Sequence, residues 1–343
     1  MTKTAVVILN WNGKSWLQKF LDTVVRFSSG EDASVWVADN GSTDGSVEWI
    51  EGNSPQTKII RFTENNGFAG GYNQALEIIK AEYFVILNSD VEVTEGWLKP
   101  MIRFMDENPD VASCQPKIRS YYNRDYFEHA GAAGGYIDKY GFPFCRGRIF
   151  DSTEKDEGQY NDHTDIFWSS GACMMVRASH WEICGGFDSD FFAHMEEIDL
   201  CWRFHKAGFR VSFIPDSVVF HAGGGSLPYE SEYKTYLNFR NNLLMLYKNL
   251  PQKNLRLTLF KRKILDGSAA LHFLLKGKPR HFISIIKAHY HYYKCSKSLK
   301  SKRSDILKIS KPDSVSQILD RSIVLDYWIK GRKTFSEINS KIK

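Results

Sequence analysis

The sequence predicts an α/β fold with a doubly wound, mostly parallel sheet, followed by a helical C-terminal extension. Three observations lead to this prediction. Short apolar runs alternate with helical patterns over residues 1–92, an order typical of parallel strands joined by crossover helices. Polar clusters follow the apolar runs, where strands would end. The charge also changes sign near residue 250, because residues 251–343 hold 22 Lys and Arg but only 6 Asp and Glu.

The elements of the first half are predicted from the spacing of their apolar residues. Unbroken runs of Val, Ile, Leu and Phe indicate buried strands, whereas apolar residues three and four apart indicate helices. Strands are expected at 5–9, 34–38, 59–62 and 83–87. Helices are expected at 14–25, 46–50 and 71–79.

The second half has a mixed order. A helix at 96–107 precedes a strand at 111–116, and residues 119–165 are rich in Tyr, Gly and Asp, which favours loops or antiparallel pairs. Next come a strand, a turn and a short helix, then a loop entering a helix. Residues 210–226 read as strand, turn, strand and glycine loop, and the pattern is helical beyond residue 233.

This order suggests an α/β domain over 1–230, with halves 1–92 and 93–230, and a basic helical extension over 231–343. The chain has 343 residues, 43% hydrophobic and 25% charged, as is ordinary for a globular protein. Its first apolar run is too short for a signal peptide, and no run of about 18 apolar residues occurs. We therefore expect a cytoplasmic protein, in which the six scattered cysteines are free thiols.

Four polar clusters stand at the ends of the predicted strands. They are Asn10-Trp11-Asn12, Asp39-Asn40-Gly41-Ser42, Asn65-Asn66-Gly67 and Asn88-Ser89-Asp90. Each alone is typical of a turn. If the strands are parallel, however, all four meet at one edge of the sheet, in the crevice where such sheets bind ligands.

The stretch "NNGFAGGYNQAL" fits neither the dinucleotide nor the P-loop motif. Its paired glycines, Gly70 and Gly71, still permit a close approach of the backbone at the start of a helix, where amides attract anions.

Seven segments in a fixed order resemble the family 2 glycosyltransferases of the GT-A fold, especially the rhamnosyltransferase-like branch of bacterial surface-polysaccharide assembly. The segments are "VILNWNG", "VADNGSTDGS", "ENNGFAGGYNQAL", "ILNSDVEV", "SGACMMVR", "GGFDSDFFAHMEEIDLCWRFHKAGFRVSFIPDSVVFHAGGGS" and "NFRNNLLMLYKN". The resemblance covers residues 4–250 and fades over the basic tail. It implies transfer of a sugar from a nucleotide diphosphate to a hydroxyl, with inversion at the anomeric carbon.

The resemblance also implies roles in nucleotide binding. Asp39 would accept a hydrogen bond from a uracil or thymine base, and Asn10 and Asn12 would line the nucleotide pocket. A further set would shape the wall near the ribose and diphosphate: Asn65, Gly67, Gly70 and Asn73.

Asn88-Ser89-Asp90 occupies the place of the family's Asp-x-Asp motif, which holds a divalent cation against the departing diphosphate. The first acid is Asn in this chain, so Asp90 would be the chief carboxylate ligand and Asn88 would lie nearer the sugar or ribose. His221 would be a second ligand, although a lone His after a strand is more often structural. Oxygen ligands with an imidazole suit Mg²⁺ or Mn²⁺.

The catalytic base is expected in "MEEID". The resemblance points to Glu197, with Glu196 as the alternative. A carboxylate whose pKa is raised by burial or by a neighbouring acid suits this role. Acids at a helix N-terminus can also merely complement the macrodipole, and for Asp199 we favour that reading. Arg203 is expected to pair with Asp199 or Glu196, or to meet a phosphate, and we favour the structural pairing.

The acceptor floor is expected at Trp168, Ser169 and Gly171, because Trp stacks on the apolar faces of sugars. A core Trp is an equal alternative. The basic tail mixes Leu, Ile and Phe with Lys, which fits either helices lying on the inner face of the plasma membrane or helices packed on the catalytic domain. No nucleic-acid recognition motif accompanies the charge.

The sequence therefore predicts an inverting, metal-dependent glycosyltransferase. The expected donor is dTDP-L-rhamnose, otherwise a UDP-sugar, and the expected acceptor is a glycan or lipid-linked glycan of the cell surface. Two alternatives stay open: a nucleotidyltransferase, and a non-catalytic glycan-binding or scaffold protein, for which Asn88 is the best argument.

Overall fold

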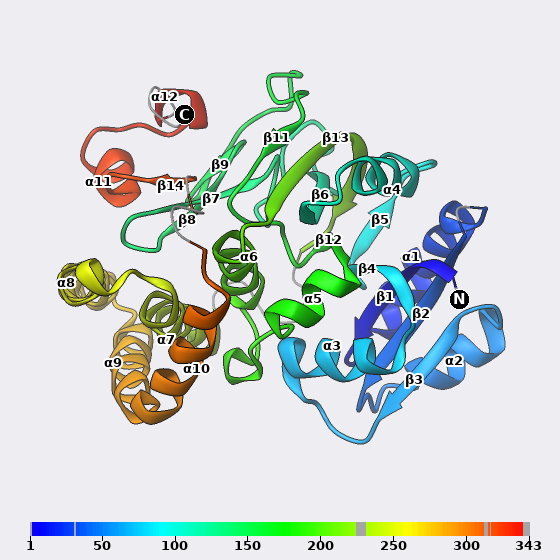
Figure 1. Cartoon of the computed structure of the whole chain (residues 1–343), viewed down its shortest axis with the longest axis horizontal. Helices are drawn as coiled ribbons and strands as arrows, with labels where there is room; N and C mark the ends of the chain where they lie inside the picture. The colour runs from blue at the N-terminus through cyan, green and yellow to red at the C-terminus, as the bar shows by residue number, and fades with distance from the viewer. Residues whose placement is uncertain (1, 31, 224–230, 312–314, 316, 339–343) are drawn as a thin grey trace.

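A central sheet organises the molecule in the computed structural model, which describes residues 2–30, 32–223, 231–311, 315 and 317–338 (Figure 1). Within these residues the sheet has nine strands, in the order β11-β13-β6-β12-β4-β1-β2-β3 with β5 beside β13. The strands are β1 (Thr2–Asn10), β2 (Ala33–Asn40), β3 (Lys58–Phe62), β4 (Ala81–Asn88), β5 (Val91–Val93), β6 (Val111–Ser120), β11 (Thr164–Asp165), β12 (Cys173–Arg177) and β13 (Arg210–His221).

The first half is the predicted parallel unit. β1 pairs in parallel with β2 and β4, and β2 pairs in parallel with β3. The crossover helices are α1 (Lys14–Ser28), α2 (Ser46–Asn53) and α3 (Gly67–Ile78). α3 begins four residues before the predicted start because Gly67 adopts a φ of 72° and lets the helix begin there.

Two buried clusters lie on the two faces of the sheet, as a doubly wound fold requires. Alternate β1 residues divide between them: Val6 and Ile8 face one cluster, Ala5 and Val7 the other. Leu17 of α1 joins the first cluster and Tyr72 of α3 joins the second. The predicted fold class is confirmed.

The second half extends this sheet with mixed pairing. β12 runs antiparallel to β4 and β6, whereas β13 is parallel to β6. β13 is one strand rather than the predicted strand, turn and strand. Its register against β6 shifts between Ile214 and Val218, so a bulge at Pro215, which has no N–H to donate, replaces the expected turn. The end of the predicted glycine loop, 224–226, falls outside the described residues.

The Tyr-, Gly- and Asp-rich segment forms a small second sheet, in the order β10-β9-β8-β7-β14. Its strands are β7 (Gly135–Asp138), β8 (Pro143–Cys145), β9 (Arg148–Ile149), β10 (Ser152–Thr153) and β14 (Ile318–Leu319). β7 to β10 pair antiparallel, as predicted. β14 comes from the C-terminal extension, so the chain returns to this sheet.

Helices cover the sheets and build the C-terminal region on the left of Figure 1. They are α4 (Leu98–Glu107), α5 (Ala178–Cys184), the 3-10 turn η1 (Ser189–Phe191), α6 (Glu196–Lys206), α7 (Glu232–Asn249), α8 (Gln252–Leu275), α9 (Pro279–Lys294), α10 (Ser296–Ile309), α11 (Ile323–Trp328) and α12 (Phe335–Ile338). Leu243 and Leu246 of α7 belong to the same buried cluster as Phe204 of α6. The extension therefore shares its buried core with the second half of the domain, residues 93–230.

None of the helices described is both long enough and apolar enough to cross a bilayer. The six cysteines are free thiols, as predicted, and all but Cys295 are buried.

Candidate active site

The polar clusters predicted at the strand ends do meet at one edge of the sheet. Nδ2 of Asn10, at the end of β1, donates to Oδ1 of Asp39 at 3.0 Å and to Oγ of Ser42 at 3.1 Å. The side chain of Asn12 accepts from the backbone N–H of Thr43 at 2.7 Å. Asn10 and Asp39 are both buried, and their pairing fixes the carboxylate in one orientation.

The other two clusters join the same edge. Nδ2 of Asn40 donates to Oδ1 of Asn65 at 3.0 Å, which links the second cluster to the third. Gly13 lies between Asn10 and the fourth cluster: a Cβ at this position would stand 2.5 Å from Oδ1 of Asn10 and 3.4 Å from Oγ of Ser89. Glycine is required here because any side chain would collide with the Asn10 amide.

A cavity of about 340 Å³ opens beside Asp39. Its walls come from the ends of β2 and β3 and the start of α2: Gly41, Ser42, Thr43, Val47, Glu48, Glu51, Arg61, Phe62 and Thr63 join Asp39. Each Asp39 oxygen already accepts one hydrogen bond, from Asn10 or from the Ser42 N–H. A carboxylate oxygen has a further lone pair, so Asp39 can still accept from a ligand.

Asp90 and His221 are distant in the sequence and close together in the structure. They are 131 residues apart, yet Nε2 of His221 lies 3.2 Å from Oδ1 of Asp90. Nδ1 of His221 lies 3.0 Å from Oε2 of Glu128. Burial alone would lower the pKa of His221, but the two carboxylates raise it to about 10.

Glu128 is a site residue that the sequence prediction missed. It lies in the segment 119–165, where the only signal was an acid among Tyr, Gly and Asp, and its distance from His221 depends on the course of that segment. Burial would raise the pKa of Glu128, but His221 holds it below the usual range. Within the described residues, no three or more His, Cys, Asp or Glu side chains form a complete metal site. Asp90 and His221 still offer an oxygen and a nitrogen at one point, and a cation that binds there would displace the Nε2 proton, since only the unprotonated nitrogen is a ligand.

The two candidate bases stand at the start of α6 in different environments. Glu196 is 4% exposed, and burial followed by the charge of Glu197 raises its pKa well above the ordinary value. Glu197 is less buried than Glu196, and desolvation raises its pKa to about 7. In the part of the chain that the structure describes, Oε2 of neither residue has a hydrogen-bond partner. Glu197 is therefore poised to exchange a proton near neutral pH.

Glu197 is next to the Asp90 region through the backbone turn that precedes β12. A Cβ on Gly171 would lie 4.0 Å from Cβ of Glu197. The following residue, Ala172, accepts from the N–H of Asn88 at 3.0 Å. The predicted base and the Asn88-Ser89-Asp90 cluster therefore lie on either side of one short segment.

The loop before α6 is held in unusual backbone conformations. Phe192, His194 and Met195 have φ angles of 63°, 69° and 73°, which are costly for residues with a side chain. Phe192 also accepts, through its carbonyl oxygen, from the N–H groups of Phe68 and Ala69 at the start of α3. These two amides at the start of α3, where helix amides could attract an anion, are thus engaged by the loop. A Cβ on Gly67 would stand 2.5 Å from the Phe192 ring, so Gly67 is needed for this close approach.

Asn73 fastens the same loop further upstream. Its Nδ2 donates to the carbonyl oxygen of Phe187 at 2.8 Å, and its Oδ1 accepts from the Phe187 N–H at 2.9 Å. Gly70 faces Asn66 and Ser189. Gly67, Gly70 and Asn73 therefore pack against loop 187–195, whereas Oδ1 of Asn65 accepts from Asn40 and from the Gly67 N–H. The contact of these four residues with a nucleotide stays a prediction.

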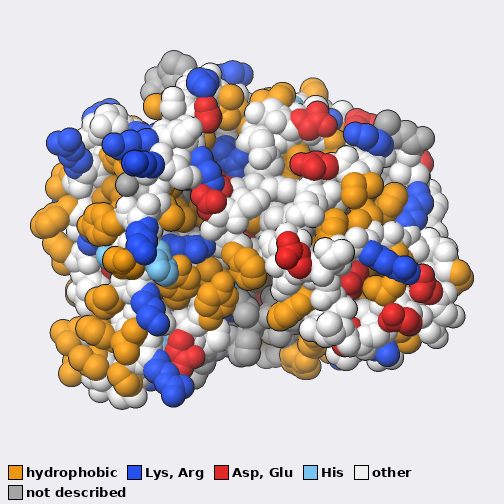
Figure 2. All heavy atoms as spheres, turned by 90° about the horizontal axis from the view of Figure 1, so that it is seen from below, with side chains coloured by type: hydrophobic (Ala, Val, Ile, Leu, Met, Phe, Trp, Pro, Cys, Tyr) orange, Lys and Arg blue, Asp and Glu red, His pale blue; other side chains and the backbone are white. Residues whose placement is uncertain are grey.

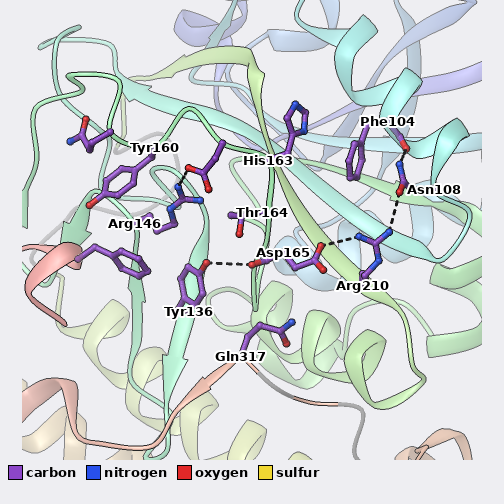
Figure 3. Close-up of a pocket in the computed structure, with 13 residues that line it drawn as sticks. Phe104, Asn108, Tyr136, Arg146, Tyr160, His163, Thr164, Asp165, Arg210 and Gln317 are labelled. Carbon is purple, nitrogen blue, oxygen red and sulfur yellow. Dashed lines mark hydrogen bonds and ion pairs between the residues drawn. The ribbon is translucent and has the colours of Figure 1, made fainter. Parts of the chain in front are cut away.

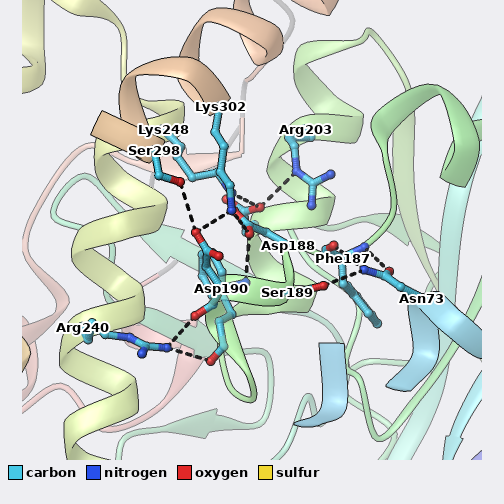
Figure 4. Close-up of polar contacts among 12 residues, drawn as sticks. Asn73, Phe187, Asp188, Ser189, Asp190, Arg203, Arg240, Lys248, Ser298 and Lys302 are labelled. Carbon is cyan, nitrogen blue, oxygen red and sulfur yellow. Dashed lines mark hydrogen bonds and ion pairs between the residues drawn. The ribbon is translucent and has the colours of Figure 1, made fainter. Parts of the chain in front are cut away.

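The C-terminal helices hold this loop from the other side (Figure 4). The buried Lys248 of α7 donates to Asp188 at 2.6 Å and to Asp199 at 2.9 Å. Lys302 of α10 contacts both Asp188 and Asp190. Burial would raise the pKa of Asp188, but Lys248 and then Lys302 hold it well below its usual range.

Asn241 of α7 completes the hold on the loop by donating to the carbonyl oxygens of Phe191, Ala193 and His194. Asp199 pairs with Arg203 at 3.0 Å, as predicted. The extension is thus part of the structure that positions Glu197.

Trp168 and Ser169 are core residues rather than an open acceptor floor. Trp168 is 4% exposed, packs over Gly135 and donates to the carbonyl oxygen of Tyr136 at 2.9 Å. Ser169 is fully buried against Ser113. This burial contradicts the predicted stacking of Trp168 on a sugar, since the ring has no free face. Gly171, beside Glu197, is the residue of this group that lies at the site.

A second cavity, of about 790 Å³, lies at the other end of β13 (Figure 3). Its charged groups are paired with one another: Arg146 with Asp162, and Arg210 with Asp165 at 3.1 Å. Arg210 begins β13, whereas His221 ends it. The cavity is therefore separated by the length of that strand from the sheet edge that carries the four polar clusters, and we assign it no part in the chemistry.

Comparison with known proteins agrees with this geometry. Residues 5–184 match the sequence model described as "Glycosyl transferase family 2". The chain is 25% identical over 231 residues, 63% of this chain and 75% of the relative, to the N-acetylglucosaminyl-diphospho-decaprenol L-rhamnosyltransferase of Mycobacterium tuberculosis.

Two solved structures show the same fold. One is TarS 1-349 of S. aureus in complex with UDP-GlcNAc, at a TM-score of 0.57 and 15% identity, covering 90% of this chain and 89% of that one. The other is the mannosyltransferase PcManGT of Pyrobaculum calidifontis in complex with GDP-Man and Mn²⁺, at a TM-score of 0.52 and 16% identity, covering 90% of this chain and 85% of that one. The predicted GT-A fold is confirmed.

Proposed function

Because this chain belongs to glycosyltransferase family 2, and is a glycosyltransferase of glycan biosynthesis, we propose that it transfers L-rhamnose from dTDP-L-rhamnose, with inversion, to a lipid-linked glycan. The observation that carries the proposal is the meeting of Asp90 and His221 at the sheet edge that also holds Asp39. The name of the mycobacterial relative, a rhamnosyltransferase acting on a diphospho-decaprenol acceptor, supports the choice of donor and acceptor class. A UDP-sugar is the alternative donor.

Asp39 and its cavity would receive the pyrimidine base. The carboxylate is fixed by Asn10 and keeps lone pairs for the imide N–H of thymine or uracil. Adenine has no imide N–H and would leave Asp39 without its partner, so Asp39 favours a base that carries one.

Asp90 and His221 would hold a divalent cation, Mn²⁺ or Mg²⁺, through Oδ1 and Nε2. Bound there, the cation supplies positive charge to the departing diphosphate. PcManGT was solved with Mn²⁺, which supports this assignment. Asn88 leaves the site with one carboxylate fewer than an Asp-x-Asp motif, and His221 provides the second protein ligand.

Glu197 would remove the proton from the acceptor hydroxyl as the sugar is attacked from the opposite side. Its pKa of about 7 makes it a base at physiological pH that can still take up a proton. Burial, and then the charge of Glu197, raise the pKa of Glu196 well above its ordinary value, which favours its protonated form. Glu197 is thus preferred over Glu196.

The test is a donor panel of dTDP-L-rhamnose, UDP-sugars and GDP-mannose with a diphospho-lipid acceptor and Mn²⁺. We expect release of dTDP, and a product of the opposite anomeric configuration by NMR, only with the rhamnose donor. Release of pyrophosphate from nucleoside triphosphates would instead support a nucleotidyltransferase. Binding of the acceptor without turnover of any donor would support the scaffold alternative.

A further inference from the structure

The outward side of α8 and α9 carries an apolar surface that the described chain leaves uncovered. We call it the outer face and define it by six residues: Leu257, Phe260, Ile264 and Leu271 of α8, and Ile286 and Tyr290 of α9. Each is between 53% and 63% exposed. Figure 2 shows hydrophobic side chains gathered over the part of the molecule built by the C-terminal helices, with Lys and Arg among them.

The α8 residues of the outer face form one stripe, because they follow one another by three, four and seven positions. The opposite side of α8 is already used. Arg262 and Asp266 form a buried ion pair there, and His289 of α9 lies 3.1 Å from Asp266. Rotating α8 to hide its stripe would break this buried pair. The stripe therefore stays on the outside.

The exposed charges of α8 and α9 are all positive. Asp266 is the only acidic residue between positions 251 and 304, and it is fully buried in the ion pair. Exposed lysines flank both helices, including Lys253, Lys261, Lys276 and Lys287. An apolar stripe with cations on its borders and no exposed acid is complementary to a surface that is apolar inside and anionic outside.

We propose that the outer face docks on a bilayer containing anionic phospholipids. The Leu, Ile and Phe side chains enter the boundary between headgroups and acyl chains, and the lysines contact lipid phosphates. Tyr290 suits the same boundary because it joins an apolar ring to a polar hydroxyl. A second copy of this chain is a poorer occupant, since two such faces would bring like charges together.

Hydrogen bonds made by α7 connect the helix that carries part of the outer face to loop 187–195. Oγ1 of Thr235 on α7 lies 2.8 Å from Nδ1 of His281 on α9, and the Tyr236 hydroxyl lies 2.6 Å from Nδ1 of His291. The same helix holds loop 187–195 through Asn241. Docking would thus fix the active site at a membrane surface. Its usefulness rests on the proposed lipid-linked acceptor, whereas the docking itself does not depend on the sugar chemistry.

The experiment is flotation of the full chain with vesicles of phosphatidylcholine, alone or mixed with phosphatidylglycerol, at low and high salt. We expect binding to the mixed vesicles that weakens as salt rises. Replacing Phe260→Ser together with Ile264→Ser should weaken binding by about tenfold or more, because two apolar contacts are lost. Ile183→Ser on α5 is the matched control, since Ile183 is 53% exposed and Ile264 55%; it should bind as the wild type does.

Two further measurements separate the outcomes. Lys261→Glu with Lys287→Glu should abolish the preference for anionic lipid while leaving the melting temperature unchanged, because both side chains are exposed. Equal flotation of the wild type and the Phe260/Ile264 variant would overturn the proposal, as would a wild-type dimer in sedimentation that this variant abolishes. Calorimetry with dTDP on the same samples shows whether a loss of flotation leaves the nucleotide site intact, so failure of the docking is distinguished from failure of the proposed function.

Discussion

Replacing Glu197 by Gln tests the assignment of the base. The substitution keeps the shape of the side chain and removes its ability to take a proton, so kcat should fall by roughly a hundredfold to ten-thousandfold. Glu196→Gln is the matched control on the preceding residue. Because burial and the charge of Glu197 raise the pKa of Glu196 and so favour its protonated form, the neutral amide resembles that form, and activity should stay within about threefold of the wild type.

The same assignment fixes the pH dependence. With a pKa of about 7, Glu197 is mostly protonated at pH 6 and mostly ionised at pH 8. Only the ionised carboxylate can accept the proton of the acceptor hydroxyl, so kcat/KM should rise about tenfold between pH 6 and pH 8 and level off above. The assay is the rate of nucleoside diphosphate release at saturating metal over this pH range.

A flat profile between pH 6 and pH 8 would refute the assignment. So would a Glu196→Gln enzyme that loses as much activity as Glu197→Gln, since Glu196 would then be acting as the base. Circular dichroism and thermal melts of both variants show whether a loss of activity comes from unfolding.

Three further substitutions test the surroundings of the site. Glu128→Gln removes the negative charge beside Nδ1 of His221 and should weaken Mn²⁺ binding about tenfold, measured by calorimetry; unchanged affinity would contradict the role of Glu128 in orienting His221. Lys248→Met leaves Asp188 and Asp199 without their shared buried cation. It should lower the free energy of unfolding, measured in urea, by about 3–5 kcal/mol. A loss below about 1 kcal/mol would instead show that Lys302 and Arg203 are enough to compensate the two carboxylates. Gly67→Ala, at a φ of 72° and against the Phe192 ring, should lower kcat by displacing loop 187–195 while Gly52→Ala, in open space on α2, should not.

The parallel half of the fold could be predicted because its signals are local. The apolar runs of β1 and β4 and the helical spacing of α1 each need only a short window of sequence. The meeting of the four polar clusters followed from topology, since parallel strands end at one edge, and the hydrogen bonds of Asn10 and Asn40 confirm it.

Other parts of the site depend on contacts between distant segments. Glu128 meets His221 only because the irregular segment after β6 folds back along β6, the neighbour of β13 in the sheet, and no spacing in the sequence encodes that path. The burial of Trp168 depends on Gly135, 33 positions earlier, opening space for the ring. The charge of the extension suggested a separate unit. Lys248 and Asn241 nevertheless contact loop 187–195. The sequence could not predict this, because it does not distinguish a buried lysine from an exposed one.

The measurement that tests the central claim most directly is calorimetric titration of the protein with dTDP, UDP and GDP, each with and without Mn²⁺, repeated on Asp90→Ala. The structure predicts that dTDP or UDP binds in the presence of Mn²⁺, and that Asp90→Ala loses the dependence on Mn²⁺. Metal-independent binding of equal strength in the wild type and Asp90→Ala would contradict a cation held by Asp90 and His221. No binding of any pyrimidine diphosphate would contradict the donor site itself.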